Sequence, residues 1–391
     1  MHPENQTTSN PSKDIIQQTV GIYPLTPLNI SFYHHYNIER VICKKDGLSY
    51  SALKDNPILK ISVNDEIIEH NIANNFDNGL VESLENKTLP AVLLCAPPYN
   101  HIDNLLDEIR DIALNLIDKE LLKGHSTLKR IYFPTFILIS NGIIYDEVIY
   151  NLKTKLQKAE IPEPIITNIA DKIVRASVMQ DAYKDNDTYF PDQKGSLKIA
   201  LPKFPLFSQV VDILNSNEFK FSVNTNPHRV EFEKALVNIA TNTIALIFAL
   251  DKANYKLRKI NIKEALSPAN YAHKTLVDEL QKAIFEIGKR AGAFPETEVF
   301  EKAWLPRKEQ LIKDKGYQVS SSLQCFKTMI KNNTLPEKYF LSEYSLTYPL
   351  ACYAKHYELF DEILLLEELD KMLVQTLEFA HKYSDKIIFT F

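Results

Sequence analysis

A line of polar side chains inside an otherwise apolar segment is the part of the sequence best suited to chemistry. Lys234, Asn238 and Asn242 recur every four residues within the stretch 231–247. On a helix this spacing puts the three side chains on one face, about one turn apart. Asparagine is a poor helix former because its amide competes for backbone hydrogen bonds. Two asparagines in an apolar helix therefore need an explanation.

Two explanations fit the spacing. In the structural one, both amides tie down neighbouring backbone and Lys234 extends to the surface. In the functional one, a cation and two amides form a wall that suits an oxygen-rich substrate such as a 2-keto acid. Lys234 would then donate a proton to a carbonyl oxygen or bind a carboxylate. The spacing does not choose between these roles.

Length and charge limit the class of protein. The chain has 391 residues, 45% of them apolar, which is too much for one ordinary core and indicates two domains. Acids and bases are interspersed around a net charge of −5, without the basic stripe that nucleic acid requires. The longest strongly apolar run, 239–250, is shorter than the ~20 residues of a membrane span. Neither nucleic acid nor a membrane is expected as a partner.

The first residues and the cysteines indicate the compartment. Residues 1–13 are polar and lack the charged and apolar regions of a signal peptide, so we expect a flexible tail. The four cysteines form no Cys-x-x-Cys pair, which is typical of reduced thiols in a cytosol. The ten histidines show no metal-ligand spacing, and His34 and His35 are expected on an ordinary helix. We therefore predict a cytoplasmic protein without a metal site.

Alternating short strands and helices fill the first part of the chain, which favours a parallel sheet covered by helices. Strands are predicted at 15–21, 40–44, 58–62, 91–96, 135–140, 172–179, 196–201 and 219–223. Later segments have helical periodicity, at 228–250, 269–291, 297–314 and 336–382. The predicted fold class is α/β, with a Rossmann-like domain over 14–226 and an all-α domain over 227–391.

These segments, in this order, resemble the ketopantoate reductase family. The family's C-terminal domain opens with a helix patterned Lys-x-x-x-Asn-x-x-x-Asn, which matches the polar line at Lys234. Residues 136–142 resemble the family's strand that ends in Asn-Gly, and this places Asn141 near the nicotinamide and the substrate. Residues 319–324 resemble the family's Ser-Ser-Met-Leu-Gln segment, with Ser321 at the position of the substrate-binding serine.

The resemblance also implies roles for these residues. Lys234 would be the general acid at the keto oxygen, and Asn238, Asn242 and Ser321 would hold the substrate's oxygens. The family's acidic residue matches Glu343, which would hydrogen-bond Lys234 or the substrate hydroxyl, if residues are inserted around 331–338. Taken alone, Ser321 could equally be a helix N-cap, and Glu343 a solvated helix charge.

The chain departs from the family at the dinucleotide loop. The family's first strand ends in Gly-x-Gly-x-x-Gly, whose glycines let pyrophosphate approach the backbone and the helix start. Here the sequence is Gly21-Ile-Tyr-Pro-Leu-Thr, so only the first glycine remains. Tyr23 brings a bulky side chain to this loop, and Pro24 lacks an N–H donor. Binding of NADP(H) is therefore in question.

The remaining candidates for NADP(H) contacts lie around this loop and the next strand. Gly21 keeps the first glycine position, and Thr26 could cap the first helix and offer its hydroxyl to a phosphate. Lys44 and Lys45 end the second strand, where a 2′-phosphate would lie, although both could equally be surface charges.

Three functions follow from this mixed pattern. The first is an NADPH-dependent reductase of a small 2-keto acid, foremost 2-dehydropantoate to pantoate in pantothenate and coenzyme A synthesis. The alternative is a non-enzymatic ligand-binding or regulatory descendant that has lost dinucleotide binding. The third is a dehydrogenase of another substrate, such as an opine or hydroxy acid, suggested by the inserted segment 325–340. The sequence indicates no oligomeric state.

Overall fold

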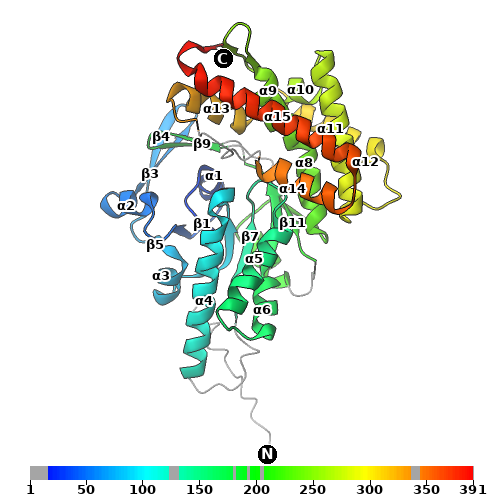
Figure 1. The fold of residues 1–391 in the computed structure, drawn as a ribbon. Helices are drawn as coiled ribbons and strands as arrows, with labels where there is room; N and C mark the ends of the chain where they lie inside the picture. Colours follow the sequence, from blue (N-terminus) through cyan, green and yellow to red (C-terminus); the bar gives the residue numbers. More distant parts are fainter. Residues whose placement is uncertain are drawn as a thin grey trace, which may run out of the picture. The chain divides into compact units, whose positions relative to one another are not determined.

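The computed structural model describes residues 16–122, 132–178, 182–191, 194–202, 207–335 and 344–390 (Figure 1). The chain divides into two compact units. Unit 1 consists of Met1–Ser140 and Tyr145–Thr225, and unit 2 consists of Asn141–Ile144 and Asn226–Phe391. The second unit therefore includes a short segment from within the first.

The main sheet of unit 1 has the strand order β12-β11-β8-β7-β6-β1-β2-β5. Its strands are β1 Gln17–Tyr23, β2 Arg40–Cys43, β5 Phe76–Asn78, β6 Pro90–Cys95, β7 Thr135–Leu138, β8 Ile173–Val178, β11 Leu197–Ala200 and β12 Phe221–Asn224. Neighbours from β5 to β8 pair in parallel, and β11 pairs antiparallel to β8. The order reverses between β1 and β6, as in dinucleotide-binding folds. β6 and β7 are buried along their whole length, as expected for strands covered on both faces.

Helices connect the strands of unit 1 and cover the sheet (Figure 1). They are α1 Pro27–His35, α2 Leu48–Asp55, α3 Gly79–Glu85, the 3₁₀ turn η1 Tyr99–His101, α4 Ile102–Leu122, α5 Tyr145–Lys158, α6 Glu163–Ala170 and α7 Ser208–Ser216. The crossover through α1 and the crossover through α4 run in opposite directions from the centre of the sheet. Because such crossovers are right-handed, α1 and α4 cover opposite faces.

A smaller sheet in unit 1 has the order β4-β3-β10-β9. It contains β3 Ile58–Val63, β4 Glu66–Asn71, β9 Ala182–Asp185 and β10 Thr188–Pro191. The strand expected at 58–62 therefore exists but lies outside the main sheet. The reason is the turn at Asn64 and Asp65, whose φ angles of 51° and 65° suit a two-residue hairpin that returns the chain antiparallel.

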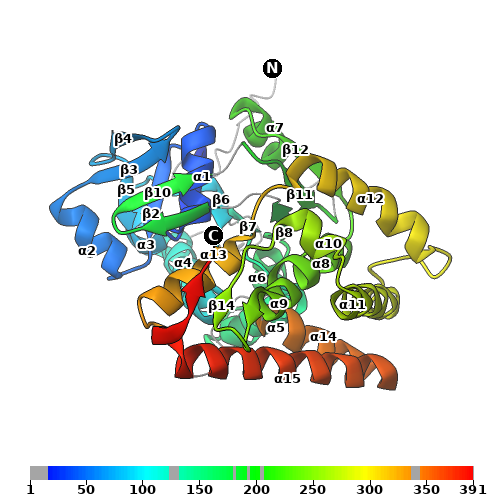
Figure 2. The same cartoon turned by 90° about the horizontal axis from the view of Figure 1, so that it is seen from above.

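Unit 2 is mostly helical (Figure 2). Its helices are α8 Pro227–Asn238, the π-helix η4 Ile239–Ile244, α9 Ala245–Ala249, α10 Ile262–Leu266, α11 Tyr271–Arg290, α12 Phe300–Lys315, α13 Ser321–Lys331, α14 Tyr344–His356, α15 Phe360–Lys382 and the 3₁₀ turn η5 Ser384–Lys386. Three short strands, β13 Leu250–Asp251, β14 Lys256–Leu257 and β15 Ile388–Phe389, form a small sheet. The predicted fold class is confirmed, and the part of the last helical segment at 336–343 lies outside the described residues.

The run from α8 to α9 forms the centre of unit 2. By length and composition, Pro227–Ala249 alone among the described helices would be able to cross a membrane. However, 89% of its most apolar window is buried inside the structure. Val230–Val237 are buried without interruption, including the charged residues Glu231, Glu233 and Lys234. The run therefore has the properties of a core helix.

Candidate functional site

The turn between β1 and α1 is where a Rossmann-like unit would hold a dinucleotide. Tyr23 ends β1 and is only 1% exposed. Its hydroxyl donates a hydrogen bond to Glu108 Oε1 at 2.7 Å, and its carbonyl accepts from the Ala96 amide at 3.0 Å. Burial, followed by the nearby Glu108, raises the pKa of Tyr23, so the hydroxyl stays protonated. The tyrosine side chain is thus a fixed part of the unit's core.

Glu108 receives hydrogen bonds from three loops at the carboxyl edge of the sheet. Besides Tyr23 after β1, it accepts from the Lys45 amide after β2 at 3.4 Å and from the Leu80 amide after β5 at 2.6 Å. Its side chain is on α4 and is 7% exposed. Burial raises the pKa of Glu108, while the hydrogen bonds from Leu80, Tyr23 and Lys45 act in the opposite direction. One carboxyl group therefore links the ends of three strands.

The start of α1 is also closed by short-range contacts. Thr26 is the N-cap, as the sequence suggests, and its Oγ1 accepts from the Asn29 amide at 3.4 Å. Pro27 occupies the first turn and brings no N–H donor. The Asn29 side-chain amide donates to the carbonyl oxygens of Tyr23 at 2.9 Å and Pro24 at 2.7 Å. Sequence analysis missed Asn29, although a buried asparagine early in a helix is a detectable signal.

The other predicted cofactor residues of unit 1 lie nearby but differ in environment. Gly21 lies inside β1, paired with Arg40 and Leu93, two residues before the strand ends. A Cβ atom on Gly21 would lie 2.5 Å from the Pro90 side chain, so close sheet packing accounts for this glycine. Lys44 is half-buried and Lys45 is exposed, directly after β2. Their contact with a 2′-phosphate stays a prediction.

These residues do not fit the pyrophosphate of a dinucleotide at the β1–α1 turn. Tyr23 occupies the second glycine position, where pyrophosphate needs an unhindered backbone. Pro24 and Pro27 supply no amide donors, and the Thr26 hydroxyl accepts the Asn29 amide. The nearby Glu108 is a buried acid rather than a cation. Bulk, missing donors and charge at this turn therefore all oppose NADP(H).

Asn141 lies in a short segment after β7, and hydrogen bonds hold the residues directly before it. Ser140 Oγ donates to the Pro97 carbonyl at 2.7 Å. The buried guanidinium of Arg175 donates to the carbonyls of Leu138 at 2.7 Å and Ser140 at 2.8 Å. The segment Asn141–Ile144 itself belongs to unit 2. Arg175 was missed, although an arginine inside the apolar run 173–178 is an unusual signal.

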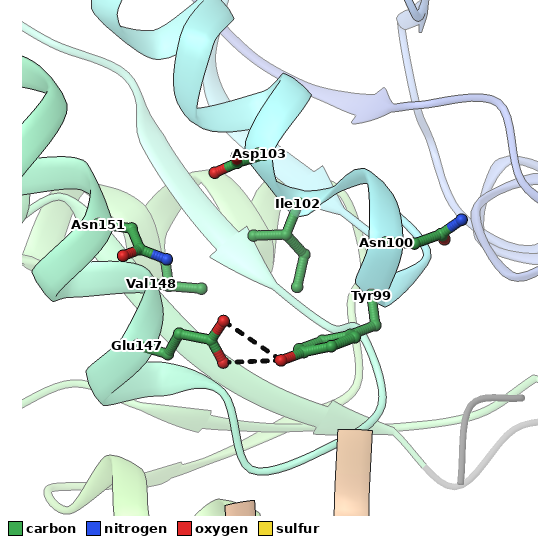
Figure 3. Close-up of a pocket in the computed structure, with 7 residues that line it drawn as sticks. All are labelled: Tyr99, Asn100, Ile102, Asp103, Glu147, Val148 and Asn151. Atoms are coloured by element: carbon green, nitrogen blue, oxygen red, sulfur yellow. Dashed lines mark hydrogen bonds between the residues drawn. The ribbon is translucent and has the colours of Figure 1, made fainter. Parts of the chain in front are cut away.

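A pocket of about 240 Å³ lies between the first turns of α4 and α5 in unit 1 (Figure 3). It is lined by Tyr99, Asn100, Ile102, Asp103, Glu147, Val148 and Asn151. The Tyr99 hydroxyl points to Glu147 and lies 3.2 and 3.0 Å from its two oxygens (Figure 3). Asp103 and Glu147 lie near the positive ends of their helix dipoles, which accounts for acids there. None of the predicted site residues lines this pocket.

The predicted substrate-binding line lies on the central helical run of unit 2. Lys234 is 7% exposed and lies on α8, which Asn238 ends. Asn242 lies on the π-helix η4, where N–H groups bond five residues back, so the α-helical face is shifted there. Thr241 Oγ1 donates to Asn242 Oδ1 at 3.2 Å and to the Val237 carbonyl at 3.1 Å. Asn238 and Asn242 are both half-buried.

Buried charges surround this line on α8. The carboxylate of Glu231 accepts from the Ile144 amide at 2.9 Å, within unit 2. Glu233 forms ion pairs with Arg229, at 2.9 Å, and with Arg307. Arg229 also makes a bidentate pair with Glu298 at 2.6 and 2.8 Å, and these hydrogen bonds raise its pKa further. These charges hold the first half of α8 rigidly in place.

The two remaining predicted residues lie at and beyond the start of α13. Ser320, not Ser321, is the N-cap of α13, and its Oγ accepts from the Leu323 amide at 3.3 Å. Ser321 is the first residue of α13, which packs against η4 and α9. The Ser321 side chain and all of Glu343 lie outside the described residues. Their substrate roles stay predictions. Among the described residues, no group of three or more His, Cys, Asp or Glu side chains could hold a metal.

No protein-family model matches the sequence, and no curated protein matches it. The structure is similar to D-mandelate dehydrogenase, solved with NADH and anilino(oxo)acetate, at a TM-score of 0.61 and 12% identity over 93% of this chain and 99% of that one. It is similar to 2-dehydropantoate 2-reductase from Geobacter metallireducens, at a TM-score of 0.55 and 12% identity over 87% and 91%.

A dimeric ketopantoate reductase from Staphylococcus aureus matches at a TM-score of 0.52 and 11% identity, over 94% of this chain and 99% of that chain. At these identities the comparisons establish the fold, and the named relatives are oxidoreductases. The chain therefore has the fold of the ketopantoate reductases, with a Rossmann-like unit followed by a helical one.

Proposed function

We propose that this chain binds a small 2-keto or 2-hydroxy acid along the α8–η4 run of unit 2. The observation that carries the proposal is the burial of Lys234, which is 7% exposed, followed by the half-buried residues Asn238 and Asn242. A buried cation suits a carboxylate or a keto oxygen, and the amides suit the acid's other oxygens. The structurally similar D-mandelate dehydrogenase was solved with anilino(oxo)acetate, an oxo acid, which agrees with this ligand class.

Two functions share this ligand. One is NADPH-dependent reduction of 2-dehydropantoate to pantoate, in pantothenate and coenzyme A biosynthesis, which the names of the structural relatives support. The other is binding without turnover, by a ligand-binding or regulatory descendant of the fold. The residues of the β1–α1 turn, with Tyr23 in the second glycine position, favour the second function.

The proposal is tested by calorimetric titration of the whole protein with 2-dehydropantoate, pantoate, pyruvate, oxaloacetate and mandelate. Lys234→Met keeps most of the length of the side chain and removes its charge. Because a charge-assisted hydrogen bond contributes ~1.5–3 kcal/mol, we expect Lys234→Met to weaken binding of the preferred acid by about 10- to 100-fold. Lys282→Met, at an exposed position on α11, is the matched control and should bind normally. If Lys234→Met binds the preferred acid with the affinity of the wild type, the proposal is wrong.

A further inference from the structure

We infer that unit 1 closes its dinucleotide turn with its own side chains and works without NADP(H) or NAD(H). The inference concerns unit 1 alone and does not depend on the acid proposed for unit 2. It rests on three independent features of the turn: its bulk, its donors and its charge.

The bulk comes from Tyr23. The residue occupies the second glycine position of the turn, and its ring is 1% exposed. Because the hydroxyl is fixed on Glu108 at 2.7 Å, the ring has a partner at its far end and cannot swing out without leaving a buried carboxyl group. The space next to the backbone is therefore filled by a side chain that the fold itself holds.

Two positions of the turn have no backbone donor, and the N–H groups of Asn29 are used internally. Pro24 and Pro27 have no N–H group. The Asn29 amide donates to the Thr26 hydroxyl, and the Asn29 side chain donates to the carbonyls of Tyr23 and Pro24. The start of α1 thus directs the backbone and side-chain N–H groups of Asn29 to local acceptors, where a phosphate-binding helix start would offer such groups to the ligand.

The charge of the network opposes a phosphate. Glu108 carries a buried carboxyl group that accepts hydrogen bonds from Tyr23, Lys45 and Leu80, at the ends of β1, β2 and β5. A diphosphate at this turn would therefore meet a buried carboxyl group in place of a cation, and the ionised form of this group repels like charge strongly where water is excluded. In place of a ligand, Glu108 joins the ends of the three strands.

The first test is calorimetric and thermal titration of the full chain with NADPH and with NADH at millimolar concentration. We expect no saturable heat and no change in Tm, whereas micromolar binding would raise Tm by several degrees. Saturable binding that Lys44→Glu, Lys45→Glu weakens would overturn the inference. An acid that binds while nucleotides do not supports both proposals. If neither binds, this inference stands and the acid proposal fails.

The second test measures the network directly by amide hydrogen exchange at Lys45 and Leu80. Glu108→Gln should speed exchange of the Leu80 amide at least tenfold, as expected for loss of a charged hydrogen-bond acceptor. Asp118→Asn, an exposed acid on the same helix, should leave it unchanged. Tyr23→Phe removes only the hydroxyl and serves if Glu108→Gln does not fold. Unchanged exchange in both variants would show that the network does not hold the loops.

Discussion

The starts of α1 and α8 follow the same local rule but differ in what they do with polar groups. Each has an N-cap side chain, Thr26 or Asn226, followed by proline at the first helical position. At α1 the neighbouring residues pack and bond to one another, through Tyr23 and Glu108. After the start of α8, Lys234 and Asn238 follow on the same helix and Asn242 follows on η4. Unit 1 uses polar groups for internal contacts at the expected ligand position, whereas unit 2 has polar groups that a helix alone disfavours.

The largest effect should come from removing the Tyr23 ring. Tyr23→Ala leaves a cavity at the end of β1 and takes a donor from Glu108, so we expect a loss of about 3–5 kcal/mol in the free energy of unfolding. Urea unfolding of the full chain, followed by exchange at β1 amides, measures it. A loss below about 1 kcal/mol would mean that Tyr23 is not part of the core.

Acid should act on unit 2 through His273, on α11. Its ring is 0% exposed and stacks on Phe248 with centroids 4.3 Å apart, and burial lowers its pKa from 6.5 to about 4. The folded state therefore favours the neutral ring. This stability is fully present above pH 6.5 and is lost as the pH falls toward 4, by about 3 kcal/mol at 1.36 kcal/mol per pKa unit. His273→Phe should remove this pH dependence in thermal unfolding curves.

Glu108 in unit 1 should respond to pH in the opposite direction. Its pKa is raised in the folded state, so the protonated form is favoured by folding. Its contribution is present below the unfolded value near 4.5 and declines as the pH rises through the folded pKa. Glu108→Gln should flatten this decline. If the wild type, His273→Phe and Glu108→Gln all show the same dependence of unfolding stability on pH, the two units do not differ in their response to pH.

The two N-caps should differ in strength. Asn226 accepts from His228 and Arg229 amides at 2.9 and 3.3 Å and donates to the Gly292 carbonyl at 2.7 Å. Thr26 accepts a single long bond of 3.4 Å. We expect Asn226→Ala to cost about 2 kcal/mol and Thr26→Ala about 0.5 kcal/mol, measured by urea unfolding. Equal losses of stability in the two variants would show that the extra hydrogen bonds of Asn226 do not make it the stronger cap.

The smallest effect should be a gain. Asn238→Ala replaces a poor helix former at the end of α8, so we expect about 0.5 kcal/mol of added stability together with weaker acid binding. Such a pair of outcomes is the mark of a residue kept for a ligand. If Asn238→Ala loses stability instead, the structural explanation of this asparagine is the better one.

Sequence periodicity predicted the order of strands and helices because burial sets the period of apolar residues within each element. It did not predict which sheet received Ile58–Val63, since the hairpin at Asn64 and Asp65 decides that. Glu108 was also missed, because its partners are 28 to 85 residues away in the sequence. Its position between the buried Leu105 and Ile112 of an apolar helix face was the available signal.

The candidate site was predictable only in part. The Lys234 line was visible because its spacing is local, whereas the π-helix that displaces Asn242 has no sequence signature known to us. Tyr23 and Pro24 could be recognised as unsuited to pyrophosphate from residue type alone. The sequence could not show that the Tyr23 side chain is held in the core, because its hydrogen-bond partner Glu108 lies on a distant helix.

The segment Asn141–Ile144 has a consequence for synthesis and for dissection of the protein. Unit 2 includes these residues, which the ribosome makes before most of that unit, and the Ile144 amide bonds to Glu231. A fragment beginning at Asn226 would lack them and would bury the Glu231 carboxylate without that donor. During synthesis, these four residues therefore cannot make their contacts with unit 2 until α8 has been made. We therefore expect a fragment that begins at Asn226 to be less stable than unit 2 in the whole chain.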